Sequence, residues 1–395
     1  MQMLTTLLIT SLFLLVGCAR DTPADAPVLP PAPRDTLVLE TSRQKGWGLM
    51  PGGVGTLGLK DTAFAFAYPV KYPGELAILG ASSHPVDLTN PDLDRIDILI
   101  GERNRRKVFV VDENDNQDFR DDPVRLLDTI DWKDGEGVPV TFRVREGDSV
   151  YQSTSYMRIG ESLIGTGIGT FEHLTAEVNV RGVSYRLGLT SPGSSGFTYD
   201  RHLELAVLEE DGVPRDTLTR PDYVSMNEYI VLNEVPYRVD SISHSGDRLR
   251  LVRDPAYAST YGNQAGMLAP DFSGVTLTGD TLFREDLADR PILIANSCAC
   301  GDDPRSAEAI ADVRAAYGDY LFVLRLDSGK RDLTQGPYFD MEDPANRELY
   351  DAYREEYCSR VAYLIGRDGR IAERFDIMDW RRTLPGLRER GVIGN

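Results

Sequence analysis

The chain has 395 residues, with 43 Lys and Arg against 62 Asp and Glu, so its formal net charge is −19 at pH 7. Hydrophobic residues make up 41% of it and charged residues 27%, which suits two or three folded domains and excludes both a wholly disordered chain and a multi-span membrane protein. A surface this acidic repels phosphate backbones, and we therefore expect no nucleic-acid partner.

The first segment, residues 1–17, has the pattern of a secretory signal peptide. It carries no charge, and its apolar run from Leu4 to Val16 is shorter than the roughly 20 residues that span a membrane. The run closes with Leu15-Val16-Gly17-Cys18, which resembles the bacterial lipoprotein box, where the Cys becomes the lipidated first residue of the mature protein. The alternative is an N-terminal core helix with an inert Cys18, but no helix cap or amphipathic pattern follows.

Residues 18–35 follow as a Pro-rich tether rather than a packed element. Ala19, not Asp, comes after Cys18, and in the lipoproteins that this segment resembles this favours the outer membrane. We therefore expect a lipid-anchored protein of the cell envelope that faces the periplasm. Disulfides persist outside the cytosol. The thiols left in such a mature chain are Cys298, Cys300 and Cys358.

Residues 36–265 predict a β-rich region of one or two antiparallel sandwich or barrel units. Short β-branched runs, or runs of alternating polar and apolar residues, are bounded by Gly, Pro, Asp and Asn, and the sequence shows no convincing long amphipathic helix. The predicted strands include Arg95–Ile100, Lys107–Val111, Pro139–Val144, Thr175–Val180, Ser184–Leu189, Leu203–Leu208 and Arg248–Val252.

One loop of this region, rich in Asp and Asn, is a candidate calcium site. Alternate oxygen side chains on a tight loop can converge on a hard cation such as Ca²⁺. Gln117 replaces the Gly of an EF-hand loop, however, and Pro123 stands where its bidentate Glu belongs. The alternative is a solvated turn after a strand. The candidate ligands are Asp112, Asn114, Asn116, Asp118 and Asp122.

Residues 266–395 change to alternating strands and helices. A short apolar strand, Pro291–Ala295, is followed by a helix start at Asp302-Asp303-Pro304, where Asp caps the helix and Pro takes its first position. The later segments predict a strand, a helix, a two-stranded hairpin and a closing helix. They are Tyr320–Leu326, Pro344–Tyr357, Val361–Ile365, Arg370–Arg374 and Trp380–Arg390. The order β-α-β-α-β-β-α is that of the thioredoxin fold.

Several motifs in this part resemble the thioredoxin-like superfamily. Ala269-Pro270-Asp271-Phe272 is similar to the opening of peroxiredoxins and of TlpA-like membrane-tethered thiol–disulfide reductases, and Tyr363–Ile371 is similar to their late hairpin. Arg290–Ile294 with Ser297-Cys298-Ala299-Cys300 resembles the iodothyronine deiodinase branch. The resemblance covers one third of the chain and implies an α/β thioredoxin-like domain with thiol chemistry.

The candidate site departs from these families in several respects. Its thiols stand as Cys298-Ala299-Cys300 rather than Cys-x-x-Cys, and no His follows His244, so the deiodinase His is missing. Placing Cys300 on the family's nucleophile requires a preceding loop one residue shorter. Where thioredoxins carry a cis-Pro before the late strand, this chain has Arg360, and peroxiredoxins carry an Arg there.

The attacking thiol can also be chosen from chemistry alone. A thiolate is the reactive form of Cys, and a helix N-terminus with a nearby cation stabilises it. Cys300 lies just before the helix that begins near Pro304, and Arg360 is the best local cation. Asp302 and Asp303 add negative charge, so we expect only a modest fall in the thiol pKa.

A second thiol is needed to resolve a mixed disulfide. Cys358 lies two residues before Arg360, at the mouth of the strand that flanks the nucleophile loop in this fold, and is the first candidate. Cys298 is the alternative, although a disulfide across one intervening residue is geometrically restrictive. Structural roles stay open for all of these residues: a structural disulfide or inert thiols, and a surface ion pair for Arg360.

We therefore predict an exported, membrane-anchored thiol–disulfide oxidoreductase, or a peroxiredoxin-like reductase, that acts on disulfides of partner proteins or on a small oxidant. We expect no organic cofactor, electrons from another thiol protein, and calcium as the only metal that the sequence suggests. The competing interpretation is a non-catalytic binding lipoprotein, in which the β-rich region recognises a partner or glycan and the thioredoxin-like domain is a degenerate scaffold.

Overall fold

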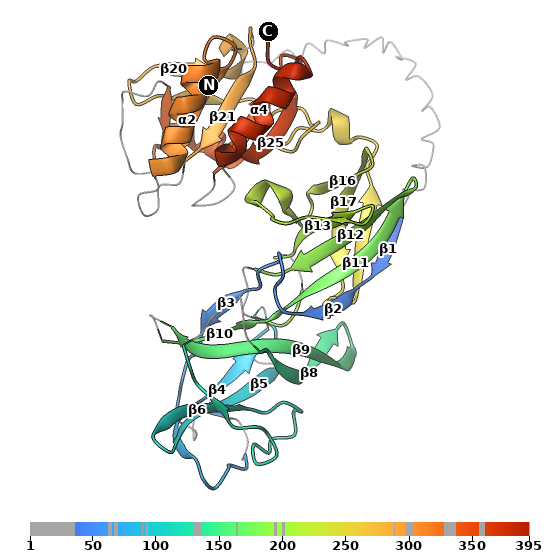
Figure 1. The fold of residues 1–395 in the computed structure, drawn as a ribbon, viewed down its shortest axis with the longest axis vertical. Helices are drawn as coiled ribbons and strands as arrows, with labels where there is room; N and C mark the ends of the chain where they lie inside the picture. Colours follow the sequence, from blue (N-terminus) through green and yellow to red (C-terminus); the bar gives the residue numbers. More distant parts are fainter. Residues whose placement is uncertain are drawn as a thin grey trace, which may run out of the picture. The chain divides into compact units, whose positions relative to one another are not determined.

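The computed structural model describes residues 36–394 apart from several short segments, and strands dominate it (Figure 1). Among the described residues, no helix has the length and apolar character needed to span a membrane. The segments outside the description within this range are 62–64, 67–69, 89, 92–93, 130–135, 163–164, 193–195, 200–201, 288, 298–303, 328–336 and 355–359.

Residues 36–253 form a region of antiparallel strands, as predicted. The strands pair into three sheets of four, in the orders β1-β18-β17-β16, β3-β10-β9-β8 and β4-β5-β6-β7, and one larger sheet, β14-β13-β12-β11-β2, with β15 beside β13. Their bounds are β1 Thr36–Glu40, β2 Ser42–Lys45, β3 Val54–Thr56, β4 Ala77–Pro85, β5 Arg95–Arg103, β6 Arg106–Val111, β7 Arg125–Leu126, β8 Val138–Glu146, β9 Ser149–Ser162, β10 Gly165–Thr170, β11 Glu172–Val180, β12 Val183–Thr190, β13 Glu204–Glu210, β14 Val213–Pro214, β15 Val224–Ser225, β16 Tyr229–Leu232, β17 Val235–Ile242 and β18 Arg248–Arg253.

The two largest apolar cores of this region each lie between two of its sheets. One core takes alternate side chains of β11–β13, such as Leu187, and of β16–β18, such as Leu251. The other joins side chains of β5 and β6, such as Ile98, to those of β8–β10, such as Phe142. Because side chains alternate across a strand, one face of β8 and of β11 enters a core, which explains their period-two pattern. Strands β5 and β6 are buried on both faces, with Leu99 and Val110 in a smaller core on the other side.

A buried ion pair links the neighbouring strands β2 and β11. Glu172 of β11 is 2% exposed and pairs with Arg43 of β2. The hydroxyl of Tyr199 donates to the same carboxylate at 3.0 Å, and the guanidinium of Arg43 also donates to the Ser245 carbonyl at 2.5 Å. The pair thus joins segments that lie far apart in the sequence and leaves the carboxylate with several donors.

The last part of the chain is a mixed five-stranded sheet in the order β23-β22-β21-β24-β25. Strands β21, β22 and β23 are parallel, β24 is antiparallel to β21, and β25 is antiparallel to β24. Apart from the additional strand β23, the elements from β21 to α4 follow the predicted order β-α-β-α-β-β-α. The bounds in this part are β19 Ser273–Val275, β20 Thr281–Phe283, β21 Ile292–Asn296, α2 Pro304–Tyr317, β22 Phe322–Asp327, β23 Tyr338–Asp340, α3 Arg347–Tyr353, β24 Val361–Ile365, β25 Ile371–Asp376 and α4 Trp380–Glu389, with short 3₁₀ turns at Arg284–Leu287, Pro344–Asn346 and Ile377–Asp379. Two further 3₁₀ turns, Arg220–Asp222 and Tyr257–Ser259, come before this part of the chain.

Helices cover both faces of this sheet. Helices α2 and α4 lie on one face (Figure 1), where their apolar side chains, such as Ile310 and Leu384, pack with Leu293 of β21. Leu349 of α3 packs with Ile294 of β21 on the other. Strand β21 is therefore central in the sheet and buried along its whole length.

Two details differ from the prediction in this part. The helix predicted over Pro344–Tyr357 is shorter in the structure. A 3₁₀ turn capped by Asp343 leads into α3. Helix α3 ends at Tyr353, because Arg354 is extended (φ −110°, ψ 120°) and the Tyr353 carbonyl accepts a hydrogen bond from the side chain of Asn296. Strand β23 was not predicted, since its three residues carry too short a pattern to be recognised.

Candidate functional site

The candidate site lies at the carboxyl end of β21, where two polar residues close an apolar strand. Asn296 and Ser297 are 0% and 1% exposed. The chain then enters Cys298 and Cys300, which lie outside the described residues, as do Cys358 and Cys18. The geometry of the site must therefore be built from the residues that lead into and out of these thiol positions.

Asn296 binds both ends of the segment that contains Cys358. Its side-chain amide donates to the carbonyls of Tyr353, at the end of α3, and of Val361, at the start of β24, both at 2.9 Å. Its Oδ1 is buried and accepts no hydrogen bond within the described part of the chain. Since Cys358 lies between these two carbonyls in the sequence, the chain enters and leaves that segment beside Asn296, two residues before Cys298.

On the neighbouring strand β22, Arg325 contacts the last described residue before the thiols. Arg325 is 5% exposed, and its backbone pairs with Ala295 of β21. Its Nε donates to the Oγ of Ser297 at 3.1 Å, and its guanidinium lies over the ring of Tyr338, 5.1 Å from the centroid. The Ser297 amide donates to the Leu326 carbonyl at 3.0 Å, which extends the β21–β22 contact by one residue.

Arg360, the predicted cation, lies beside β21 on the opposite side, just before β24. Its Nη2 is 3.3 Å from the Oδ2 of Asp376 at the end of β25. The other oxygen of Asp376 accepts from the Met378 amide at 2.9 Å, and the Arg360 carbonyl accepts from the Ile377 amide. The structure thus places Arg360 in an ion pair, and its role beside a thiol stays a prediction.

The two arginines differ in how they relate to the end of β21. The Nε of Arg325, on the adjacent strand β22, reaches Ser297 at this end, whereas the guanidinium of Arg360, just before β24, is paired with Asp376 of β25. Positive charge next to a thiol favours the thiolate, which is the nucleophile in disulfide exchange. The end of a central strand also provides a rigid support for reactive side chains that follow it.

The sequence prediction did not include Asn296, Ser297 or Arg325. A signal for the first two was present, because a polar Asn-Ser pair ends an otherwise apolar strand. For Arg325 the signal was a single charged residue inside the apolar run Tyr320–Leu326. A charge in a buried strand must be compensated by specific contacts, and such residues are often functional.

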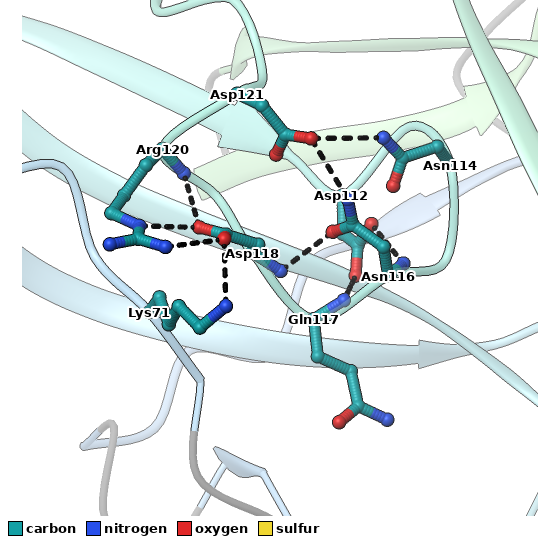
Figure 2. Close-up of polar contacts among 8 residues, drawn as sticks. All are labelled: Lys71, Asp112, Asn114, Asn116, Gln117, Asp118, Arg120 and Asp121. Carbon is teal, nitrogen blue, oxygen red and sulfur yellow. Dashed lines mark hydrogen bonds and ion pairs between the residues drawn. The ribbon is translucent and has the colours of Figure 1, made fainter.

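The Asp- and Asn-rich loop after β6 is described in full, and its side chains bond mainly to the loop itself. Both carboxylate oxygens of the buried Asp112 accept backbone N–H groups, from Asn116 at 3.0 Å and from Gln117 at 2.7 Å. The Oδ1 of Asn116 accepts from the Asp118 amide at 2.8 Å. Figure 2 shows these contacts, together with Asp121, whose carboxylate accepts from the side-chain amides of Asn114 and Asn116.

Charged partners complete the loop. Asp118 accepts from Arg120 and Lys71, and these hydrogen bonds hold its pKa well below the ordinary range (Figure 2). Asp122 accepts from the Glu113 amide at 3.1 Å through one oxygen. Burial raises the pKa of Asp122 to about 6, and the nearby carboxylates of Asp112, Asp121 and Glu113 add to the rise.

These contacts form Asx turns, the local hydrogen bonds of Asp and Asn side chains, although Asp112 and Asp122 are buried and not solvated as the alternative predicted. Within the part of the chain that the structure describes, no group of three or more His, Cys, Asp or Glu side chains is arranged to hold a metal ion. Calcium binding by Asp112, Asn114, Asn116, Asp118 and Asp122 stays a prediction from the sequence.

No protein-family profile matches the chain, and no curated protein matches it in sequence. Solved structures with partial similarity are thioredoxin-like thiol–disulfide oxidoreductases. One is the thioredoxin domain of a thiol–disulfide oxidoreductase from Bacteroides vulgatus, with 12% identity and a TM-score of 0.25 over 30% of this chain and 96% of that one.

Two others have similar values. A thiol:disulfide interchange protein of the thioredoxin family from Chlorobium tepidum has 18% identity and a TM-score of 0.25, over 30% of this chain and 93% of its own. An exposed lipoprotein thioredoxin from Streptococcus pneumoniae has 17% identity and a TM-score of 0.26, over 30% of this chain and 99% of its own. At these scores the assignment of the site depends on the contacts at the end of β21.

Proposed function

We propose that this chain is an exported, membrane-anchored thiol–disulfide oxidoreductase in which Cys298-Ala299-Cys300 supplies the attacking thiol and Cys358 the resolving thiol. The observation that supports it is the double hydrogen bond of Asn296. Asn296 and Val361 are joined by one of these hydrogen bonds. Cys298 follows Asn296 by two residues and Cys358 precedes Val361 by three, so each thiol belongs to a segment that begins or ends at this hydrogen bond.

The reaction we propose is an exchange of two electrons as thiols and disulfides. The thiolate of Cys300 attacks one sulfur of a substrate disulfide, which forms a mixed disulfide and releases the other substrate sulfur as a thiolate. The thiolate of Cys358, or of Cys298 in the alternative, then attacks the sulfur of Cys300 and releases the second substrate thiol. An internal disulfide remains, and a dithiol of another protein reduces it to restore both thiols.

The proposed location follows from the N-terminal sequence. Cleavage before Cys18 and lipidation of its thiol and amino group would anchor the chain to the membrane through the Pro-rich tether, with the rest of the protein in the periplasm. Cys18→Ala should then move the protein from the membrane fraction to the soluble fraction. A variant that still sediments with membranes, together with no lipid mass on residue 18 of the wild type, would contradict the anchor.

Turnover with a dithiol donor and a protein disulfide as substrate tests the activity. We expect Cys300→Ser to abolish turnover, and Cys358→Ser to leave the first attack intact while the mixed disulfide accumulates, as measured by mass spectrometry. Cys18→Ala is the matched Cys variant, which should keep full turnover in solution. If the wild type shows no turnover and all three thiols are alkylated slowly and equally, the binding-lipoprotein interpretation replaces this one.

A further inference from the structure

The end of the β5–β6 hairpin concentrates positive charge in a protein whose formal net charge is −19. The five residues at this end are all exposed, and four of them are cationic. They are Arg103, Asn104, Arg105, Arg106 and Lys107, which we call the cationic tip. Because the chain as a whole is acidic and repels anions, an anionic surface would approach it most easily at such a tip.

The backbone holds these cations close together. Strands β5 and β6 pair Arg103 directly opposite Arg106, across the two-residue turn Asn104-Arg105. Both turn residues have a left-handed backbone (φ 53° and 61°), which costs Arg more than it would cost Gly. Like charges directly opposite each other in a sheet are also destabilising. The cationic tip therefore gathers three arginines although their arrangement opposes folding.

Nearby carboxylates compensate only part of this charge. The ammonium of Lys107 is 2.8 Å from a carboxylate oxygen of Glu161, and Glu102 stands opposite Lys107 in the sheet register. Arg106 is 3.9 Å from Asp128, and the side chains of this pair are 62% and 71% exposed, so the pair is weak. Within the described ranges, the side chains of the other two arginines of the tip have no hydrogen bond or ion pair.

Exposed leucines lie beside the cationic tip on the two outer strands of the sheet. One row of residues crosses the sheet from Ile78 of β4 through Gly101 and Val108 to Leu126 of β7, two residues from the paired arginines. Leu126 is 43% exposed. Leu79, the extra residue of a β-bulge next to Ile78, is 57% exposed. At about 3.3 Å per residue, this row is about 7 Å from the arginine pair along the strands.

We propose that the cationic tip, together with Leu79 and Leu126, docks on an anionic membrane surface. Basic side chains next to exposed apolar ones are typical of surfaces that lie in the membrane interface, where the cations attract acidic headgroups and the apolar groups leave water. This inference goes beyond the proposed thiol chemistry and depends on neither the thiols nor the lipid anchor. A lipid anchor, where present, would keep the tip near such a surface at high effective concentration.

The test is co-sedimentation of the full-length Cys18→Ala protein, which carries no lipid on residue 18, with vesicles at low ionic strength. We expect binding to vesicles of phosphatidylcholine and phosphatidylglycerol, and weak binding to vesicles of phosphatidylcholine alone. Arg105→Gln should lower the partition coefficient for the anionic vesicles by about fivefold, and Arg103→Gln with Arg105→Gln by about tenfold or more. Raising NaCl to about 1 M, where charges are screened beyond about 3 Å, should release the protein.

Arg181→Gln is the matched control for Arg105→Gln. Arg181 is also exposed, and it lies in the two-residue turn between β11 and β12 with a left-handed backbone (φ 52°). Its replacement changes the net charge equally and should leave vesicle binding within about twofold of the unchanged protein, since a single charge outside the docking surface is screened.

The leucines are tested separately, because their replacement removes no charge. Leu79→Ser with Leu126→Ser should lower binding to the anionic vesicles by about threefold or more and leave its salt dependence intact. Circular dichroism verifies that each variant is folded.

Three results would overturn the inference. They are equal binding of the protein with and without the two arginines of the tip, an equal loss in Arg181→Gln, and equal binding to vesicles with and without phosphatidylglycerol. Binding of a polyglutamate peptide without any binding to vesicles would also overturn it, in favour of an acidic protein partner. Loss of disulfide turnover with intact vesicle binding would contradict the proposed function alone.

Discussion

Buried polar groups serve different ends in the antiparallel region and in the mixed sheet. In the antiparallel region, Glu172 is surrounded by donors from Arg43 and Tyr199, which belong to segments that it fastens together. In the mixed sheet, Asn296 and Ser297 gather at the end of one strand and contact the backbone and Arg325 around the thiol positions. Burial of a polar group therefore indicates a site only when its partners lead toward reactive residues.

Breaking the Glu172 ion pair should give the largest effect on stability and none on chemistry. Glu172→Ala leaves Arg43 charged and poorly compensated, and we expect a loss of about 3–5 kcal/mol in the free energy of unfolding. Denaturant unfolding measures it, and exchange turnover per folded molecule should stay unchanged. Replacing both residues, as Arg43→Met with Glu172→Met, should recover much of the loss. A fall in turnover would show that the two regions are coupled.

Asn296 can be tested against Asn346, a second buried asparagine of this part of the chain whose side-chain amide also donates to two backbone carbonyls. Asn346 is also fully buried, and its amide donates to the carbonyls of Val275 and Asp340 at 3.0 and 2.9 Å. We expect Asn296→Ala and Asn346→Ala each to lower the free energy of unfolding by about 2–4 kcal/mol, since each leaves two carbonyls without a donor.

Only one of these two variants should change the chemistry. Asn296→Ala should also slow resolution of the mixed disulfide by about tenfold or more, because Tyr353 and Val361, which flank the Cys358 segment in the sequence, lose their shared donor. Stopped reactions analysed by mass spectrometry give the fraction of mixed disulfide. Equal turnover in the two variants would show that Asn296 has a structural role alone.

Variants of Asp112, in the loop after β6, distinguish a role in stability from a role in Ca²⁺ binding. Asp112→Ala removes the acceptor of two backbone N–H groups and should cost about 1–3 kcal/mol without any Ca²⁺, whereas Asp112→Asn keeps one acceptor and should cost less. Thermal unfolding with and without millimolar Ca²⁺ measures both. A rise in the wild-type Tm that Asp112→Ala lacks would establish a calcium site. A variant that is as stable as the wild type without Ca²⁺ would show that the turn contacts contribute nothing.

The raised pKa of Asp122, in the same loop, predicts that the free energy of unfolding depends on pH. Its folded pKa of about 6 lies above the ordinary value of 3.8, so between these values the folded chain holds a proton that the unfolded chain has lost. The free energy of unfolding should therefore fall as the pH rises from about 4 to 6, by about 1 kcal/mol once solvent screening is allowed for. Asp122→Asn should remove this fall, as urea unfolding at several pH values would reveal. An identical pH profile in the variant would contradict the assignment.

The smallest effect is expected at Arg360, the cation that the sequence alone suggested. Because Asp376 lies 3.3 Å from it, Arg360→Ala should slow alkylation of Cys300 by about threefold or less. Asp376→Asn keeps the acceptor for the Met378 amide but removes the negative charge, and it should speed alkylation slightly. A tenfold loss in Arg360→Ala would contradict this expectation and make Arg360 the main cation of the site.

The strands could be predicted from sequence because their side chains alternate, and the order of the last elements because each has its own local pattern. The thiols and Arg360 could be proposed from the sequence because Cys is rare and their spacing is local, and their roles stay predictions. Asn296 could not be assigned in this way, since its two acceptors lie 57 and 65 residues away and are backbone carbonyls that carry no residue signature. Arg325 was visible only as an anomaly in an apolar strand, and its meaning came from the register that places it beside Ala295.

The two hydrogen bonds of Asn296 also determine which effects a change in the length of one loop should have. They close a loop between Tyr353 and Val361, and the entropy of closing a loop grows only slowly with its length, by about 0.6 kcal/mol for each doubling. Residues inserted into that loop would therefore change stability little, while they would release Cys358 from its fixed distance along the chain. Insertions in this loop should therefore lower disulfide exchange far more than the free energy of unfolding.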